Sequence, residues 1–520
     1  MGGINFTIQS ALSGLRAAQA GIDVVSRNVA NANDPNYTKK IQVQNSLVNG
    51  FNPAQPQLTN GQGVQLPPVS RAIDLYLQLQ ARTAGSQQQT YSSIDTYLQR
   101  LQQVFGAPGG SSSLGAQMTA LHNAFQTLAS SPDQQPNQVA VLTAAQSLVN
   151  TFNNTTTTIQ TLRTQIDQEI TNTVQVINTD LTNIYNLNTQ VAIAQNTNQS
   201  SADLQDERDK YVNDLSQYIG VSTFLRSDGR MAVLTEANSA GGGSRFLIDQ
   251  TARQASFTAL STITAADAYV GPPAPGAGFN ATLNGVTIPV STAAGSVNVD
   301  IKSELLTGKL AGLFQLRDTI LPQAQAQIDE LAGRMADDFQ NLGAAPVQNL
   351  RLFINGPTAA GTAFVYNATN VVGFAGKIAL NNTAALNDVV GNPWRLRDGT
   401  TVGAQSTFTA DPTTLNGVLN LFETNQAFTA GTGLPTSATF EGFANGFTGF
   451  QANQISVNQG KLADKKALSD ALTQRLHNQS GVNVDDELAR MIQLQNSYSA
   501  SARVITTATQ MFSTLLQIGS

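Results

Sequence analysis

The C-terminal segment, residues 480–520, imposes the strongest constraint on the fold of this chain. It has neither proline nor glycine between Val482 and Gly519. Asn483 predicts a helix N-cap, and the three acidic residues 485–487 place negative charge where the helix dipole is positive. We therefore expect one continuous helix of roughly 34 residues, a rod about 50 Å long.

Two heptad rows of apolar and small residues run along this rod. One contains Leu488, Met491, Tyr498, Ile505, Phe512 and Leu516, and the other contains Leu494, Val504, Met511 and Leu515. A helix that lies on a globular core needs only one apolar stripe. Two stripes predict packing on two sides, against a helix of the same chain and against a neighbouring subunit. Burial in an ordinary core remains an alternative, because heptads recur by chance over short windows.

The N-terminal residues 4–32 predict a second rod with a heptad row of its own. Small residues in that row, Ala11 and Ala18, would allow another helix to approach closely. The rod should end in an Asn-rich stretch, because Asn tolerates left-handed backbone and Pro35 forbids continuation. The helix-terminating residues of this motif are Asn28, Asn31, Asn33, Pro35 and Tyr37. The two rods can pair only if the intervening chain returns to its starting point.

Helical and extended patterns alternate between the two ends. The longest helical pattern runs from about 139 to 196, and Thr155–Thr158 could break it because threonine is a weak helix former. Pro322 should kink or split a later helix over 305–342. Hairpins are expected at 223–234 and at 281–288, the second with Asn284-Gly285 as its turn.

These patterns predict a mainly α protein with β insertions, an elongated multidomain α+β subunit. It should contain terminal coiled-coil helices, a long-helix bundle domain and outer β-rich domains. We expect the terminal domain to comprise 1–40 with 480–520, and the long-helix domain 41–220 with 301–345 and 441–479. Residues 221–300 should form a β-rich domain, and 346–440 either a second one or part of the same outer domain.

Composition excludes several functional classes. Only 12% of residues are charged, the net charge is −6 and no basic block appears, so nucleic acid is not an expected partner. No apolar run reaches the ~18 residues of a membrane span, and no polybasic amphipathic helix suits a membrane surface. The N-terminus lacks the pattern of a cleaved signal peptide.

Little in the sequence supports catalysis. Cysteine is absent, there are two histidines, and no recognised catalytic motif occurs, so we expect no enzyme, no catalytic residue, no cofactor and no metal site. An acidic cluster at 203–209 is interleaved with Arg208 and Lys210. Such a pattern indicates a solvated helix face with ion pairs.

Both ends resemble a known family. Residues 11–20 (ALSGLRAAQA) and 28–38 (NVANANDPNYT) resemble the signature of bacterial flagellar axial proteins. Residues 480–488 (SGVNVDDEL), with the later runs QNSY and ARVI, resemble more specifically the hook-associated protein 1 family. Asp34 and Asn36 stand where the family often has Thr and Gly, but both still suit a turn.

The resemblance implies a structural adaptor between the hook and the filament of the flagellum, assembled through its terminal helices. It implies self-assembly into a ring, contacts with the hook protein and with a second junction protein or flagellin, and an export chaperone on the C-terminal helix. It also implies an extracellular location, with export that needs no cleaved signal peptide. The residues expected to form the assembly interface are Ile8, Leu15, Ile22, Val25, Val29, Leu488, Met491, Leu494, Tyr498, Val504, Ile505, Met511, Phe512, Leu515 and Leu516.

Two other functions remain open at this stage. The chain could be a secreted adhesin or carbohydrate-active protein whose β-rich regions do the work and whose helical ends anchor it. It could also be another flagellar axial protein, a hook protein or a flagellin.

Overall fold

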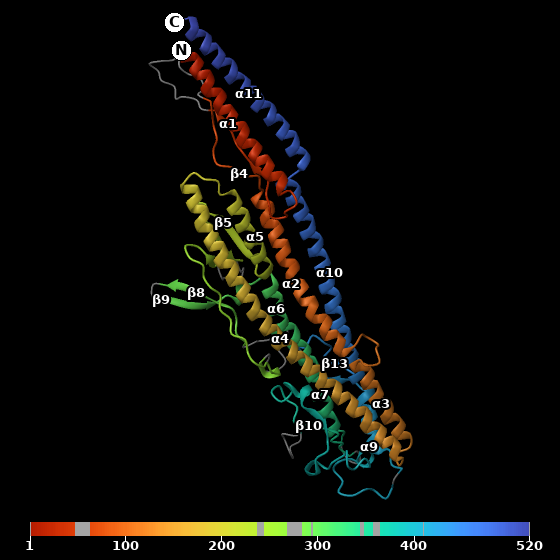
Figure 1. Cartoon of the computed structure of the whole chain (residues 1–520). Coiled ribbons are helices and arrows are strands. Elements are labelled where there is room, and N and C mark those ends of the chain that lie inside the picture. The colour runs from red at the N-terminus through yellow and green to blue at the C-terminus, as the bar shows by residue number, and fades with distance from the viewer. Residues whose placement is uncertain are drawn as a thin grey trace.

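The computed structural model describes residues 2–46, 63–236, 244–267, 283–292, 295–343, 348–356, 364–408 and 410–518. Long helices run along one axis, small sheets lie on their flank, and both chain ends lie at the same tip (Figure 1). The expectation of an elongated, mainly α protein with β insertions is confirmed. The domain boundaries given above remain predictions.

The first and last helices form an antiparallel pair, α1 (Gly2–Ala30) with α11 (Val484–Ile518), that stands apart from the other helices (Figure 1). The predicted N-cap of α11 is confirmed, because Oδ1 of Asn483 accepts the backbone N–H of Asp485 at 3.0 Å. The N-terminal and C-terminal helices are therefore neighbours, as the heptad rows predict.

Below this pair in Figure 1, the rest of the molecule is built mainly on long helices. Helix α10 (Phe440–Ser480) ends just before α11 and packs along α2 (Leu75–Phe105), with α3 (Leu114–Ser130) beyond it. Helix α5 (Ala202–Tyr218) packs against both α4 (Gln135–Asn196) and α2. No described helix is apolar enough over sufficient length to cross a membrane.

Helix α4 (Gln135–Asn196) runs unbroken for 62 residues, so the predicted break at Thr155–Thr158 does not form. Tertiary contacts override the weak helix propensity there. Gln325 donates to the hydroxyl of Thr156 at 3.1 Å, and Ile159 is fully buried one turn further on.

One continuous apolar core joins these helices to the β segments. The ring of Phe339 lies at its lower end, with centroids 5.9, 5.3 and 6.0 Å from those of Phe125, Phe353 and Phe422. The helix is not split at Pro322, because the backbone stays helical from residue 309 to residue 340 and only a π-helical turn lies before the proline. Helix α6 (Lys309–Gln315) passes through a π-helical turn, Leu316–Ile320, into α7 (Leu321–Gln340), and Pro322 lies in the first turn of α7.

The β segments are small antiparallel sheets. Strands β5 (Val221–Leu225), β6 (Met231–Thr235) and β7 (Phe246–Ile248) form one sheet, which confirms the first predicted hairpin. The prediction of the second hairpin is wrong, because it places the turn too early in the sequence. The observed hairpin is β8 (Thr287–Thr292) with β9 (Gly295–Asp300), so Asn284-Gly285 precedes it, and residues 281–282 lie outside the described part. Asn284 is exposed, and its side chain donates to the carbonyl of Thr258 while its own carbonyl accepts from Arg317.

Shorter elements complete the chain. The far tip, around α7, holds β10 (Phe353–Asn355), β11 (Ile378–Leu380), α8 (Arg395–Asp398), α9 (Thr413–Glu423), β12 (Gln426–Ala427) and β13 (Ser437–Ala438). Near the terminal pair lie the two-residue strands β1 (Lys40–Ile41), β2 (Asn45–Ser46), β3 (Val64–Gln65) and β4 (Ser70–Arg71), paired β1 with β4 and β2 with β3.

Asp180 of α4 predicts a pH dependence of stability. Its side chain is buried, and this burial, with the nearby carboxylate of Asp214 on α5, raises its pKa to about 6. Because the native pKa exceeds the unfolded one, the cost of ionising Asp180 in the fold appears as the pH rises past about 4 and is complete above about pH 6. We expect Asp180→Asn to raise the free energy of unfolding by about 1–2 kcal/mol at pH 7 and by almost nothing at pH 4.

Denaturant unfolding of the purified chain at both pH values measures this. The exposed Asp133→Asn is the matched control and should change stability little at either pH. An Asp180→Asn gain that is equal at pH 4 and pH 7 would contradict the assignment.

Candidate assembly interface

The seam between α1 and α11, meaning the facing residues of the two helices, is built on small side chains. Gly14 faces Ser501, and Gly21 faces Leu494. A Cβ atom at position 21 would lie 2.9 Å from the methyl carbons of Leu494, so glycine there permits the close approach of the two helices. Further along α1 the buried residues are Ala17, Ala18, Val24 and Val25, and on α11 Ala508 is buried.

The predicted interface residues divide between the seam and the open surface. Val25 is buried, and the half-buried members are Ile8, Leu15, Ile22, Val29, Met491, Leu494, Ile505 and Phe512. The exposed members are Leu488, Tyr498, Val504 and Met511. The side chains of Leu515 and Leu516 lie outside the described residues. Whether the exposed members contact other subunits remains a prediction.

The prediction that each heptad row of α11 serves a separate side is wrong. Met491 and Ile505 of the first row lie on the same seam as Leu494 and Ala508 of the second. Residues three or four apart share one helix face, so alternate members of the two rows combine into a single stripe. The remaining members form the flanks of that stripe.

Those flanks are apolar, and no residue in the described part of the chain covers them. Met511 is 57% exposed and Val504 is 44% exposed. Ile492, 60% exposed, belongs with them and was missed by the heptad analysis, because it lies outside both rows. The sequence signal for Ile492 is a large apolar residue directly after Met491, in a helix whose other positions outside the two rows are mostly polar.

Asn28 does not terminate α1, as the sequence motif suggests. It lies within the last helical turn, fully buried, and none of the described asparagines in this motif has positive φ. Its amide nitrogen donates to Oε2 of Glu487 at 2.9 Å and to the carbonyl of Lys40 at 3.0 Å. Its amide oxygen accepts from the Lys40 N–H and the Tyr37 hydroxyl. Asn28 thus joins α1, α11 and the loop that follows α1.

The other residues of the motif shape that loop. The backbone N–H of Asp34 donates to the carbonyl of Asn31, and that of Tyr37 donates to the carbonyl of Asp34, giving two successive turns around Asn33 and Pro35. Burial, with the charge of Asp203, raises the pKa of Tyr37 to about 12, so its hydroxyl stays protonated and donates to Asn28.

A buried carboxylate fixes the start of α11. Glu487 is fully buried, and Lys39 Nζ lies 2.9 Å from its Oε1. The backbone N–H of Lys39 also donates to the carbonyl of Ser480 at the end of α10. One residue of the loop therefore contacts both sides of the break between α10 and α11.

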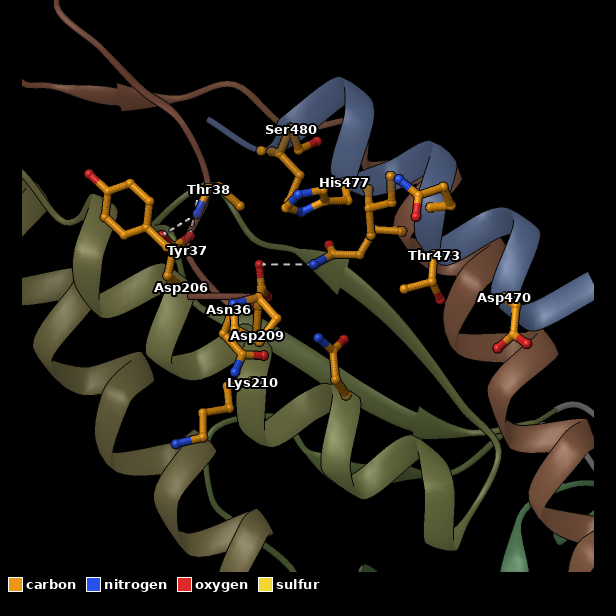
Figure 2. A pocket seen from close by; sticks show the side chains of 17 residues that line it. Asn36, Tyr37, Thr38, Asp206, Asp209, Lys210, Asp470, Thr473, His477 and Ser480 are labelled. Carbon is orange, nitrogen blue, oxygen red and sulfur yellow. Dashed lines mark hydrogen bonds between the residues drawn. The ribbon is translucent and has the colours of Figure 1, made fainter. Parts of the chain in front are cut away.

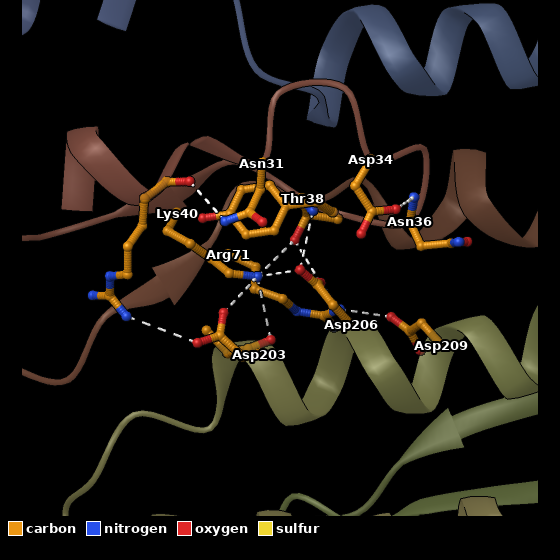
Figure 3. Close-up of polar contacts among 12 residues, drawn as sticks. Asn31, Asp34, Asn36, Thr38, Lys40, Arg71, Asp203, Asp206 and Asp209 are labelled. Atoms are coloured by element: carbon orange, nitrogen blue, oxygen red, sulfur yellow. Dashed lines mark hydrogen bonds and ion pairs between the residues drawn. The ribbon is translucent and has the colours of Figure 1, made fainter. Parts of the chain in front are cut away.

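A second set of buried charges, here called the joint network, ties this loop to the long helices (Figure 3). It comprises Lys40, Arg71, Arg82, Asp206 and Asp209. Lys40 pairs with Asp206, and Arg71 Nη1 lies 2.9 Å from Asp206 and 2.7 Å from Asp209. Arg82 of α2 pairs with Asp209 at 3.3 Å.

The expectation of a solvated acidic face on α5 is therefore wrong for two of its carboxylates. Asp206 and Asp209 are buried, and their partners come from the loop, β4 and α2 and not from the same helix. Burial alone would raise the pKa of Asp209, but Arg82 and Arg71 hold it below its usual value. Asp203 and Glu207 are exposed as predicted, although Asp203 Oδ1 also lies 3.5 Å from Lys40 Nζ.

A pocket of about 480 Å³ lies beside the joint network (Figure 2). Tyr37 and Thr38 from the loop and Asp206 from α5 line one side, while Thr473 and His477 from α10 line the other. Within the described ranges, no group of three His, Asp or Glu side chains is placed to hold a metal ion. The pocket marks the place where the terminal pair meets the long helices.

Comparison with known proteins defines the class first. Residues 8–38 match the family model of flagella basal body rod proteins, and residues 474–518 match the C-terminal model of the flagellar basal body rod FlgEFG proteins. These two segments are α1 with its loop, and α11 with the end of α10. A subunit whose paired ends carry both segments is a flagellar axial protein.

The rest of the chain specifies the family. Residues 98–347 match the model of the flagellar hook-associated protein FlgK helical domain. The chain is 26% identical to flagellar hook-associated protein 1 of Escherichia coli (strain K12), over 98% of this chain and 99% of that protein. It is 24% identical to the Bacillus subtilis (strain 168) protein of the same name, over 96% and 95%. The chain belongs to the family of flagellar hook-associated protein 1.

A solved structure has the same fold. The flagellar hook junction protein FlgK from Burkholderia pseudomallei superposes with a TM-score of 0.54 at 15% identity, over 76% of this chain and 99% of that one.

The joint network predicts a large effect of a single substitution. Asp206→Asn leaves the buried Lys40 and Arg71 without one of their counter-charges, so we expect the free energy of unfolding to fall by about 3 kcal/mol. Denaturant unfolding measures this. The neighbouring exposed Glu207→Gln serves as control and should change stability by less than about 0.5 kcal/mol. Equal effects of the two substitutions would contradict the role of Asp206.

Proposed function

We propose that this chain is a structural component of the bacterial flagellum that joins the hook to the filament and assembles through its terminal helix pair. The observation that carries the proposal is the pair itself: α1 and α11 cover one another on the seam and leave apolar flanks on α11 uncovered. The family of hook-associated protein 1, to which the chain belongs, supports the same role.

The physical argument concerns what the flanks need. Leu488, Ile492, Val504 and Met511 expose apolar surface along most of one helix. Burial of such surface stabilises an assembly by roughly 25 cal/mol per Å². A helix pair from a neighbouring subunit offers a matching rod-shaped surface, so repeated side-by-side packing would cover the flanks.

The finer parts of the proposal concern partners and place. We propose that copies form a ring, with the hook protein on one side and a second junction protein or flagellin on the other. An export chaperone would cover the flanks of α11 before assembly, and export would proceed without a cleaved signal peptide to an extracellular site. The protein would act by binding alone, without enzymatic activity. The structural character of its family supports this.

Imaging of a deletion strain tests the proposal. Cells of the source bacterium that lack this protein should carry hooks without filaments, and expression of the intact chain should restore the filaments. Normal filaments in the deletion strain would contradict the proposed role.

The flank itself gives a sharper prediction. Val504→Asp combined with Met511→Asp places two charges on one uncovered flank, one heptad apart. Both residues are exposed in the single chain, so we expect unchanged circular dichroism and thermal unfolding of the purified protein. Two charges that must be buried on assembly should abolish filament restoration.

The matched control is Thr506→Asp with Ser513→Asp, which introduces the same charges with the same spacing at exposed polar positions. It should restore filaments at least partly. Full restoration by the Val504/Met511 variant would exclude this flank from the interface.

A further inference from the structure

The seam of the terminal pair repeats with a seven-residue period. The facing pairs are Gly14 with Ser501, then Gly21 with Leu494, then Asn28 with Glu487. Each step moves seven residues forward on α1 and seven residues back on α11. A seam with such a repeat has alternative registers that differ by one heptad, about 10 Å along the axis.

The glycine positions of the seam are compatible with more than one of these registers. If α1 slides by one heptad away from the joint, Gly21 faces Ser501 and Gly14 faces Ala508. Both new pairs join a glycine to a small residue, so the close approach of the two helices is retained. At the two glycine positions, van der Waals contacts therefore do not exclude the shifted register.

Chain connectivity does not determine the register either. The loop of residues 31–38 is folded into two turns, closed by hydrogen bonds to the carbonyls of Asn31 and Asp34. Fully extended, these eight residues would span about 26 Å. Opening the turns lengthens the loop, so connectivity alone does not exclude a slide of about 10 Å.

Glu487 is the element of the seam that does distinguish them. Its carboxylate is fully buried, and it is held by the amide of Asn28 at 2.9 Å and by Lys39 Nζ at 2.9 Å. After a one-heptad slide Asn28 faces Leu494, so Glu487 loses its hydrogen bond to the Asn28 amide. Helix α1 then also covers Glu487 differently. An unpaired buried charge or amide is strongly disfavoured, so the polar pair favours the observed register. An apolar pair at these positions would not favour one register over the other.

We propose that Asn28, Lys39 and Glu487 determine the register of the terminal helix pair. They act as positioning residues: the small-residue seam supplies the packing, and these polar residues select one of its registers. The register in turn decides which residues form the apolar flanks beside α1. This last consequence rests on the proposed function, whereas the register itself does not.

Disulfide trapping tests the proposal directly, because the chain contains no cysteine of its own. Gly14→Cys with Ser501→Cys reports the observed register, since a Cβ atom at position 14 lies 3.3 Å from the Ser501 hydroxyl. Gly14→Cys with Ala508→Cys reports the register shifted by one heptad. Both reporters share one cysteine, and trapping captures the pair even when it closes only part of the time.

In the otherwise native chain we expect the 14/501 disulfide and almost no 14/508 disulfide. In the background Asn28→Leu with Glu487→Leu, the ratio of 14/508 to 14/501 product should rise about tenfold or more. Helix content and thermal unfolding of the rest of the protein should stay close to native values. An unchanged ratio would overturn the proposal, and so would loss of both disulfides.

Two controls separate register from general disturbance. Tyr37→Phe removes one hydrogen bond to Asn28 but leaves the Asn28–Glu487 contact, and it should keep the native ratio. Glu487→Gln keeps an acceptor for the Asn28 amide and should restore most of the native ratio. A shifted ratio in Tyr37→Phe equal to that of the leucine background would show that any change at this position loosens the pair, and would refute the assignment.

Failure of this experiment and failure of the proposed function can be told apart. Cross-linking is measured in the purified protein, so a negative result there contradicts the register assignment alone. Failure of the native chain to restore filaments in the deletion strain contradicts the proposed function alone. If both proposals hold, the Asn28→Leu/Glu487→Leu chain should restore fewer filaments than the Tyr37→Phe chain.

Discussion

The burial of Glu487 is the constraint on which the arrangement of the two chain ends depends. A carboxylate removed from water requires partners, and here they come from α1 and from the loop that follows it. The same loop reaches α5 through Lys40 and Asp206, and α5 reaches α2 through Asp209 and Arg82. A chain of charged contacts thus leads from the last helix to the long-helix body without passing through an apolar core.

This division separates two kinds of stabilisation along the molecule. The body is held by one continuous apolar core in which aromatic rings such as Phe339 and Phe422 pack closely. The terminal pair has few fully buried apolar side chains and has exposed flanks, so it buries much less apolar surface in the single chain. The polar contacts of the loop after α1 fix the position of the terminal pair relative to the long helices. Assembly would bury the apolar surface that the pair leaves exposed.

The sequence was sufficient to predict elements whose signal is local. The cap at Asn483 and the hairpin after Val221 each follow from neighbouring residues, and both are confirmed. The break at Thr155–Thr158 was wrong, because packing against α7 outweighs helix propensity.

Long-range polar contacts could not be predicted in this way. Asn28 looks like a helix terminator and Glu487 like a first-turn acid, yet they bond to each other across 459 positions. Asp206 looks like a surface charge because Arg208 and Lys210 are close in sequence, but Lys40 and Arg71 neutralise it from distant segments. Local charge patterns carry no information about partners that only the folded chain brings near.

The short break at residues 481–483 separates α10 from α11, and these two successive helices pack against different partners. Helix α10 lies along α2 and helix α11 lies along α1, and an unbroken helix would have to present one common stripe to both. Because the helix is interrupted, α10 can pack on α2 and α11 on α1 without one shared stripe. Substitutions on the exposed flanks of α11 therefore leave the residues that hold α10 against α2 untouched.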